Sequence, residues 1–248
     1  MSTKALAKPS LAQSGVRLPI GPAVTTFLMS VYQYLENAYG DLGWWPADTV
    51  EEMVIGAILV QNVSWKNTVK ALSNLHQANL LSMSALDAAD TDVVAELIVP
   101  TRFYNMKANR LKVFARHVVT RHDGVLSNML QQPFALLRDE LLAIPGIGPE
   151  TADDILLYGA RYPSFVVDAY TKRILHRCGI IPEQVPYEEL RTWFMEHLPH
   201  QAPMFNQFHA LLDRLGNHVC LAKRPRCSEC PLQEVCDSHL RTGPVNQS

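Results

Sequence analysis

The segment LLAIPGIGPETA, residues 141–152, contains the strongest structural signal in this sequence. An apolar helical pattern ends here, Gly146 and Gly148 can form a tight turn, and Pro149 suits the first turn of a new helix. Backbone N–H groups beside two glycines and a helix N-terminus can approach an anion such as a phosphate. On its own, the segment fits a phosphate-binding hairpin and an ordinary corner between two helices equally well.

Apolar residues with helical spacing extend to both sides of this segment. Thr49 is expected to be the N-cap of one helix, with Glu52 completing a capping box. We find no alternating pattern that would predict paired β-strands. The sequence therefore predicts an all-α protein, with helices over residues 24–38, 53–60, 66–76, 91–98, 105–120, 133–142, 150–160, 168–178, 187–197 and 203–216.

The composition suits a folded chain with a sizeable core. The 248 residues are 48% hydrophobic and 19% charged, which fits one compact unit or two small lobes. No apolar run reaches the ~18 residues that span a bilayer, and no secretory signal is recognisable, so we expect a cytoplasmic protein, nucleoid-associated if bacterial. The net charge of −2 argues weakly against nucleic acid, although an enzyme needs only one basic face. Residues 1–20 and 241–248 are expected to be flexible tails.

Four of the five cysteines form a C-x6-C-x2-C-x5-C pattern near the C-terminus, at Cys220, Cys227, Cys230 and Cys236. Clustered cysteines in a cytoplasmic chain indicate a metal site rather than disulfides. Four thiolates can hold either a structural zinc ion or an iron–sulfur cluster, and general chemistry does not separate the two. Cys178 lies outside the pattern and is expected to be a buried apolar residue.

A single carboxylate follows an apolar run at Phe165–Val167. Asp168 is placed at the start of a predicted helix, where an aspartate is most often an N-cap. Taken alone, this position favours the structural role.

The order of hairpin, Asp168 and four-cysteine loop resembles the endonuclease III family of helix-hairpin-helix DNA glycosylases. The 18 residues from Glu150 to Asp168 match that family's distance between its hairpin lysine and its essential aspartate. The resemblance covers about residues 24–240. It implies a two-lobed fold with a DNA cleft between the lobes and a [4Fe-4S] cluster rather than zinc. The implied lobes are a six-helix barrel over 42–162, with its hairpin at about 134–160, and a cluster lobe formed by 21–41 plus 163–240.

This chain departs from the bifunctional members of the family at Glu150. Those members have a lysine there, which forms a Schiff base with the sugar and leads to strand cleavage, whereas a glutamate cannot form an imine. Lys172 is the only nearby amine that could substitute. The resemblance therefore implies a monofunctional glycosylase, in which Asp168 stabilises positive charge on the sugar and helps to orient water. Glu150 would line the pocket or favour the start of its helix.

Aromatic residues suggest how a damaged base would be bound. Trp44 and Trp45, then Gln61 and Phe103, and then the hairpin with Glu150, make the chain similar to the 3-methyladenine glycosylases of the endonuclease III type, which also lack the lysine. Trp65, after the end of the first barrel helix, is a further candidate for the base pocket. Positively charged alkylated purines gain cation–π energy on tryptophan rings. By resemblance, Gln61 fills the gap that a flipped base leaves, and Phe103 is the wedge. The best-known members of that branch lack the cluster cysteines, and at least one of the Trp44–Trp45 pair is expected to pack in the barrel.

Basic residues lie inside the cysteine loop, at Lys223, Arg224 and Arg226. They resemble the family's phosphate-contacting loop, although a solvated basic loop is the simpler alternative. The leading hypothesis is a base excision repair enzyme, a monomer, that removes alkylated purines from double-stranded DNA. A glycosylase for uracil, mismatched thymine or oxidised pyrimidines and a non-catalytic iron–sulfur DNA-binding protein remain alternatives.

Overall fold

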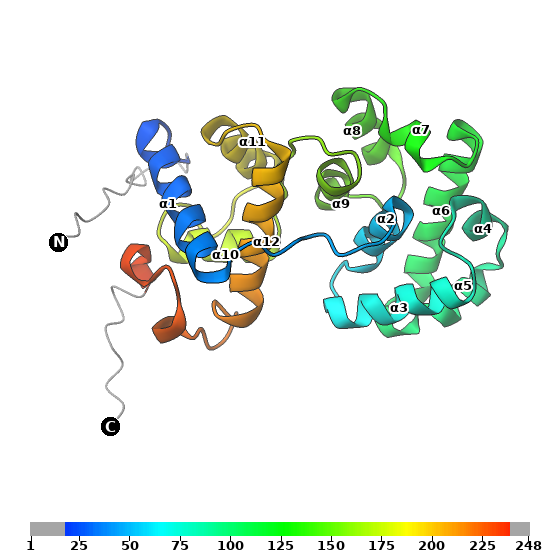
Figure 1. Ribbon diagram of the computed structural model, residues 1–248, viewed down its shortest axis with the longest axis horizontal. Coiled ribbons are helices and arrows are strands. Elements are labelled where there is room, and N and C mark those ends of the chain that lie inside the picture. Colours follow the sequence, from blue (N-terminus) through cyan, green and yellow to red (C-terminus); the bar gives the residue numbers. More distant parts are fainter. Residues whose placement is uncertain (1–17, 239–248) are drawn as a thin grey trace. The chain divides into compact units, whose positions relative to one another are not determined.

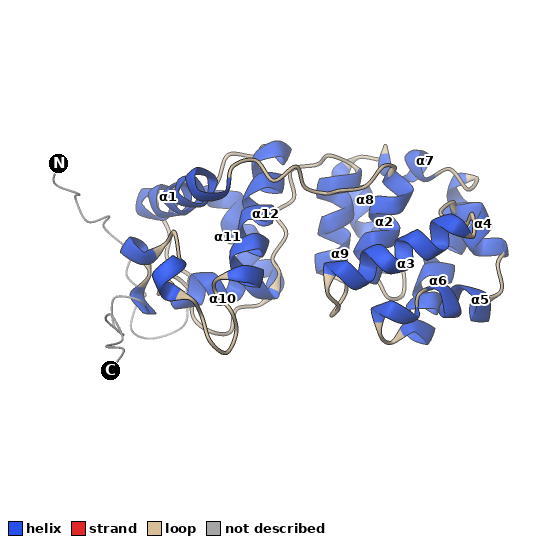
Figure 2. Cartoon of the chain, turned by 60° about the horizontal axis from the view of Figure 1, so that its bottom comes forward, coloured by secondary structure: helices blue, strands red, loops and turns tan. Residues whose placement is uncertain are grey.

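The computed structural model describes residues 18–238 and consists of helices joined by loops (Figures 1 and 2). No β-strand occurs within residues 18–238, so the predicted all-α class is confirmed. The predicted tail at 241–248 and most of the tail at 1–20 lie outside the described residues. Two residues at the end of the predicted N-terminal tail are held in place: Leu18 is buried, and the Pro19 carbonyl accepts a hydrogen bond from Trp193 Nε1 at 2.6 Å.

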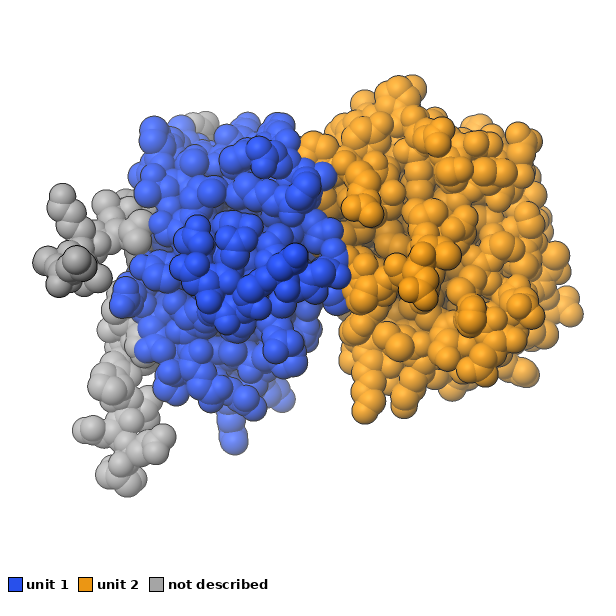
Figure 3. All heavy atoms as spheres, viewed as in Figure 1, with its two compact units in different colours: residues 1–44, 165–248 blue, residues 45–164 orange. Residues whose placement is uncertain are grey.

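The chain divides into two compact units (Figure 3). Unit 1 combines residues 1–44 with residues 165–248, and unit 2 is the continuous segment 45–164. The chain thus leaves unit 1 after Trp44 and returns to it at Phe165. The sequence placed these two changes at residues 41/42 and 162/163.

Unit 2 is built around one helix, α2, that is apolar and buried after its first turn. All residues of α2 from Met53 to Leu59 are buried, and α2 packs against α3, α6, α9 and η2. The unit contains α2 (Val50–Leu59), α3 (Trp65–Gln77), α4 (Met83–Ala88), α5 (Thr91–Leu97), η1 (Val99–Thr101), α6 (Tyr104–His122), α7 (Leu126–Leu130), α8 (Phe134–Ala143), α9 (Pro149–Asp154) and the π-helical segment η2 (Ile155–Gly159).

A buried lysine fastens the end of α2. Lys107 on α6 is only 1% exposed, and its Nζ donates to the carbonyl oxygens of Leu59 at 2.8 Å and Thr101 at 2.7 Å. Burial, with a smaller contribution from the Arg110 charge, lowers the pKa of Lys107 to about 8. The contacts satisfy carbonyls at the end of α2 and in η1 that would otherwise lose their partners inside the unit.

Within residues 18–44 and 165–238, unit 1 contains four longer helices and two short 3₁₀ turns. They are α1 (Pro22–Tyr39), α10 (Ala169–Arg177), α11 (Tyr187–His197), α12 (Ala202–His218), η3 (Cys227–Glu229) and η4 (Gln233–Val235). Its core is rich in aromatic rings. Phe165 stacks on Phe194 with ring centroids 3.8 Å apart and meets the ring of Phe205 edge-on at 5.4 Å.

Two short helices were not predicted. α4 has six residues and α7 has five, which is too short for a helical repeat to stand out from the sequence. The predicted N-cap is confirmed, because the Thr49 side chain accepts from the Glu52 N–H at 3.1 Å. The reciprocal bond differs from that of a capping box: the Glu52 side chain accepts from the Asp48 N–H at 3.0 Å, one residue before the N-cap. Among the described helices, none is both long and apolar enough to cross a membrane.

Candidate functional site

The hairpin of unit 2 joins α8 to α9 through a turn that requires glycine. Gly146 has a φ of +95°, and a Cβ atom there would lie 2.6 Å from Cγ of Arg110. Gly148 is the N-cap of α9, Pro149 opens the helix, and α9 runs directly into η2. The predicted corner is therefore present, with Arg110 of α6 lying against it. Sequence reasoning did not single out Arg110, because it lies 36 residues before Gly146.

Glu150 lies in the first turn of α9 and is exposed. A carboxylate in this place is favoured by the positive end of the helix dipole. Gln61, the predicted gap-filling residue, reaches the same turn: its Nε2 donates to Thr151 Oγ1 at 2.8 Å, and its Oε1 accepts from Arg110. The loop after α2 and the start of α9 are thus joined by side chains.

Three aromatic rings meet in unit 2. Trp45 packs edge-on against Trp65 with centroids 5.1 Å apart and lies at 5.3 Å from the ring of Tyr158. Its ring also covers Gly56 of α2, where a Cβ atom would come within 3.4 Å. Trp45 is therefore the middle ring of a group anchored to the core helix. Tyr158 was missed by the sequence analysis, and Trp44 belongs to unit 1.

Phe103 stands out of the surface just before α6. Its side chain is 65% exposed, and both Phe103 and the preceding Arg102 have left-handed backbone angles, with φ of 45° and 56°. Bulky residues rarely adopt such angles, and such strain is commonly found at functional sites. The exposed, strained position suits the predicted wedge.

Asp168 lies in unit 1 at the N-terminus of α10. Its Oδ1 accepts a hydrogen bond from the Thr171 N–H at 2.7 Å, so the N-cap interpretation is confirmed. The three residues before it, Phe165–Val167, are fully buried and fix its position, whereas its own side chain is 12% exposed. Capping uses one carboxylate oxygen, which leaves the functional role open.

Two titratable side chains of α12 surround Asp168. Nε2 of His209 lies 3.9 Å from Asp168 Oδ2. Asp213 is close enough for the Asp168 charge to affect its pKa. Burial raises the pKa of the Asp213 carboxyl, the His209 imidazole opposes this rise, and the Asp168 carboxylate adds to it. The Asp168 carboxylate therefore lies in a cluster of interacting charges.

Lys172, the possible substitute amine, is occupied elsewhere. Its Nζ donates to the Val185 carbonyl at 2.9 Å. This contact holds the amine against a backbone oxygen of unit 1.

The four cysteines of the C-terminal loop lie near one another and near the end of α10. Burial raises the pKa of Cys230 to about 11, and the thiols of Cys220, Cys236 and Cys227 add to the rise, which places all four together. Arg177 Nη1 donates to Cys220 Sγ at 3.2 Å and to the Leu221 carbonyl at 2.8 Å. Cys178, as predicted, is buried. One helix, α10, thus begins at Asp168 and ends at the cysteine loop.

The basic residues of this loop all reach solvent. Lys223, Arg224 and Arg226 are exposed. Nη1 of Arg226 lies 3.9 Å from Oε2 of Glu229, and the two side chains form an exposed ion pair. Such a pair is too weak to withhold the arginine from another anion.

Residues 55–200 match the model of the HhH-GPD superfamily of base excision DNA repair proteins. The chain belongs to this superfamily. Residues 220–236 of this HhH-GPD protein match the iron-sulfur binding domain of endonuclease III. The family resemblance predicted from the hairpin and the cysteines is therefore confirmed.

Three known proteins illustrate the likeness. A protein of Methanocaldococcus jannaschii assigned as a DNA repair glycosylase is 42% identical over 211 residues, which cover 84% of this chain and 95% of the relative. The crystal structure of 3-methyladenine DNA glycosylase from H. pylori, bound to 1,N6-ethenoadenine, has a TM-score of 0.65 at 26% identity and covers 77% of this chain and 94% of that one. The structure of an endonuclease III–DNA complex has a TM-score of 0.76 at 18% identity and covers 88% of this chain and 97% of that one. This likeness shows that the two proteins share a fold.

Proposed function

We propose that this HhH-GPD protein is a monofunctional DNA glycosylase that removes damaged bases, alkylated purines of the 3-methyladenine kind in particular. The observation that carries the proposal is Asp168, a carboxylate that the Thr171 N–H holds in place. Glu150, exposed in the first turn of α9, is the acidic residue at the family's lysine position.

Asp168 would act on the sugar through its negative charge. The Thr171 N–H holds Oδ1, so the carboxylate is preorganised, and Oδ2 is left to face developing charge or a water molecule. Breaking a glycosidic bond builds positive charge on the sugar ring, and a fixed carboxylate beside the sugar stabilises this charge more than it stabilises the uncharged sugar of the bound substrate. The same carboxylate can orient the attacking water.

Strand cleavage through an imine needs an amine at the reacting carbon. Glu150 supplies none, and Lys172 donates to the Val185 carbonyl instead. The product should therefore be an intact strand with an abasic site. This is the property that separates the proposal from a bifunctional enzyme.

The aromatic group of unit 2 would hold the flipped base. Trp65 and Trp45 are half-buried, and stacking on their rings favours bases that carry positive charge. The similarity to the H. pylori enzyme, at 26% identity, supports alkylated purines as the substrate class. Phe103 would enter the duplex, and Gln61 would fill the space beside it.

Contacts with double-stranded DNA would come from the hairpin and the basic loop. The backbone around Gly146 and Gly148 suits a phosphate, and Lys223, Arg224 and Arg226 can neutralise others. Such contacts position the protein, here taken as a monomer, without reading the sequence of the DNA.

The cysteine loop would hold a [4Fe-4S] cluster. Four thiolates can bind either zinc or an iron–sulfur cluster. The match of residues 220–236 to the iron-sulfur binding domain of endonuclease III supports the cluster. The cluster would act as a structural centre for the loop.

The deciding experiment is a panel of duplexes that each contain one damaged or mismatched base, scored for base release before and after alkali. We expect release from alkylated purines, strand breaks only after alkali, and no trapping on DNA by borohydride. Release only of uracil, thymine or oxidised pyrimidines would refute alkylated purines as the substrate class. Efficient trapping by borohydride would refute the monofunctional chemistry.

The Asp168→Asn variant tests the role of the carboxylate. It should lower base release by at least about 100-fold and keep or strengthen DNA binding, because a charge facing phosphates is removed. Asp90→Asn, at the N-cap of α5, is the matched control and should behave like the wild type. Unimpaired base release by folded Asp168→Asn protein would overturn the mechanism.

A further inference from the structure

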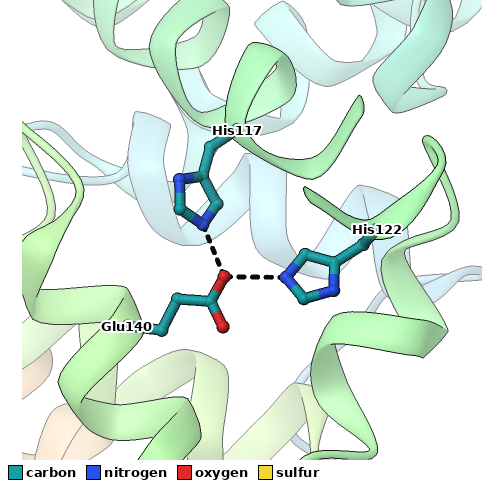
Figure 4. A group of neighbouring side chains, drawn as sticks. All are labelled: His117, His122 and Glu140. Atoms are coloured by element: carbon teal, nitrogen blue, oxygen red, sulfur yellow. Dashed lines mark hydrogen bonds and ion pairs between the residues drawn. The ribbon is translucent and has the colours of Figure 1, made fainter. Parts of the chain in front are cut away.

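Two imidazoles and a carboxylate, none of which has been assigned a role above, meet in unit 2. His117 and His122 come from the last turns of α6, and Glu140 comes from α8 (Figure 4). Within the described residues, this is the one group of three potential metal ligands whose donor atoms lie within 4.8 Å of one another.

The geometry of the group is convergent. Nε2 of His117 lies 2.6 Å from Glu140 Oε1, and Nε2 of His122 lies 2.7 Å from the same oxygen. Figure 4 shows both rings directing this nitrogen at the carboxylate. The three side chains are only 22%, 12% and 17% exposed, so water competes little for them.

A further side chain orients the carboxylate. Gln132 Nε2 donates to Glu140 Oε2 at 2.5 Å, and the Gln132 backbone carbonyl accepts from the Tyr162 hydroxyl at 2.8 Å. One carboxylate oxygen is therefore held from behind, while the other faces the two imidazoles. Protein metal sites commonly have this outer layer of hydrogen bonds, which fixes the ligand and raises its affinity.

We propose that His117, His122 and Glu140 bind one divalent transition-metal ion, and that this ion is zinc. Two imidazole nitrogens and one carboxylate oxygen form a donor set typical of zinc, with water as the fourth ligand. Around a tetrahedral ion the donor atoms lie about 3.3 Å apart, so side-chain shifts on the order of 1 Å would admit it. The ion would replace the two N–H···O contacts, and each imidazole would bind through Nε2 with its proton on Nδ1.

The bound ion would join the end of α6 to α8. Since α8 is the first helix of the hairpin, the ion would stabilise the frame that positions Gly146 and Gly148. This site contains no cysteine, so it is chemically distinct from the loop that is proposed to hold the iron–sulfur cluster.

Zinc titration of the full chain with its cluster intact tests the proposal. Calorimetry should detect one zinc ion per chain, elemental analysis should find it in addition to iron, and the melting temperature should rise with zinc concentration. Zinc K-edge absorption should show nitrogen and oxygen ligands at about 2.0–2.1 Å and no sulfur at about 2.3 Å. The absorption measurement uses the wild type, so it does not depend on any variant folding.

Variants then assign the ligands. His117→Ala and Glu140→Gln should abolish stoichiometric binding, and Gln132→Leu should weaken it by about 10–100-fold. His76→Ala is the matched control, because His76 is an exposed histidine in the last turn of α3, and it should bind as the wild type does. The proposal is overturned if the wild type binds no zinc, if its zinc has sulfur ligands, or if folded His117→Ala retains full affinity.

Discussion

The hairpin of unit 2 and the cysteine loop of unit 1 are both short turns, but they keep their shape by different means. In the hairpin, Leu141, Ile144, Ile147 and Thr151 are buried, and the turn needs no ligand. Between Cys220 and Cys236, only Leu232 and Val235 are buried, and the regular structure consists of two single turns. Packing therefore stabilises the hairpin, whereas the cysteine loop, with little buried apolar surface, should depend on what its thiolates bind.

The largest expected effect separates these two regions directly. Cys230→Ala should remove the iron and lower the opening free energy of residues 220–236 to near zero, because little apolar surface is buried there. Amides of α8 and α9 should keep their protection. Iron analysis and hydrogen exchange of both segments measure this, with Cys178→Ala as the control that retains iron. Equal loss of protection in both units would contradict the comparison.

A smaller effect should appear in unit 2 alone. The pKa of Lys107 is about 8 in the folded chain and about 10.5 when unfolded, so between these pH values the unfolded state binds more protons. The free energy of unfolding should therefore rise with pH in this range, by up to about 3 kcal/mol. Lys107→Met should lack this rise and be less stable, because the carbonyls of Leu59 and Thr101 lose their donor. Urea denaturation of both proteins measures the difference, and parallel pH profiles would refute it.

The smallest effect distinguishes two rings within unit 2. Trp65→Ala should weaken activity on an alkylated base by about 1–3 kcal/mol, the usual contribution of base–aromatic stacking. Trp45→Ala should lose similar activity and also lower the melting temperature, because Trp45 covers Gly56 and contacts two further rings. Activity assays paired with thermal melts separate the roles. Unchanged activity in both folded variants would refute the assignment of Trp45 and Trp65 to the base pocket.

Features that are local in the sequence could be predicted. The hairpin, the Thr49 N-cap and the cysteine spacing each lie within about 17 residues, so residue type and spacing were enough. Arg110 against Gly146, and Lys107 against Leu59, join residues 36 and 48 positions apart. Only the packing of α6 on α2 and on the hairpin brings these residues together, and no spacing rule encodes it.

The partners that individual side chains contact also could not be predicted from the sequence. Nothing in the spacing of His117, His122 and Glu140 indicates that they converge, because Glu140 lies on a different helix. Likewise, Lys172 is four residues from Asp168, yet its amine is bound to Val185. In both cases side-chain direction decides the role, and direction depends on the surrounding helices.

The discontinuity of unit 1 has a consequence for synthesis on the ribosome. Helix α1 buries Val24, Phe27, Leu28, Val31 and Leu35, and it packs on α11 and α12, which are translated last. At about 5–20 residues per second, the chain from residue 45 to its end takes about 10–40 s to make. The whole of unit 2 can fold in that interval, while the apolar stripe of α1 still lacks its partners. The nascent chain therefore exposes the apolar face of α1 to solvent for much of its synthesis. A chaperone that shields α1 during this time should raise the fraction of chains that reach the native state.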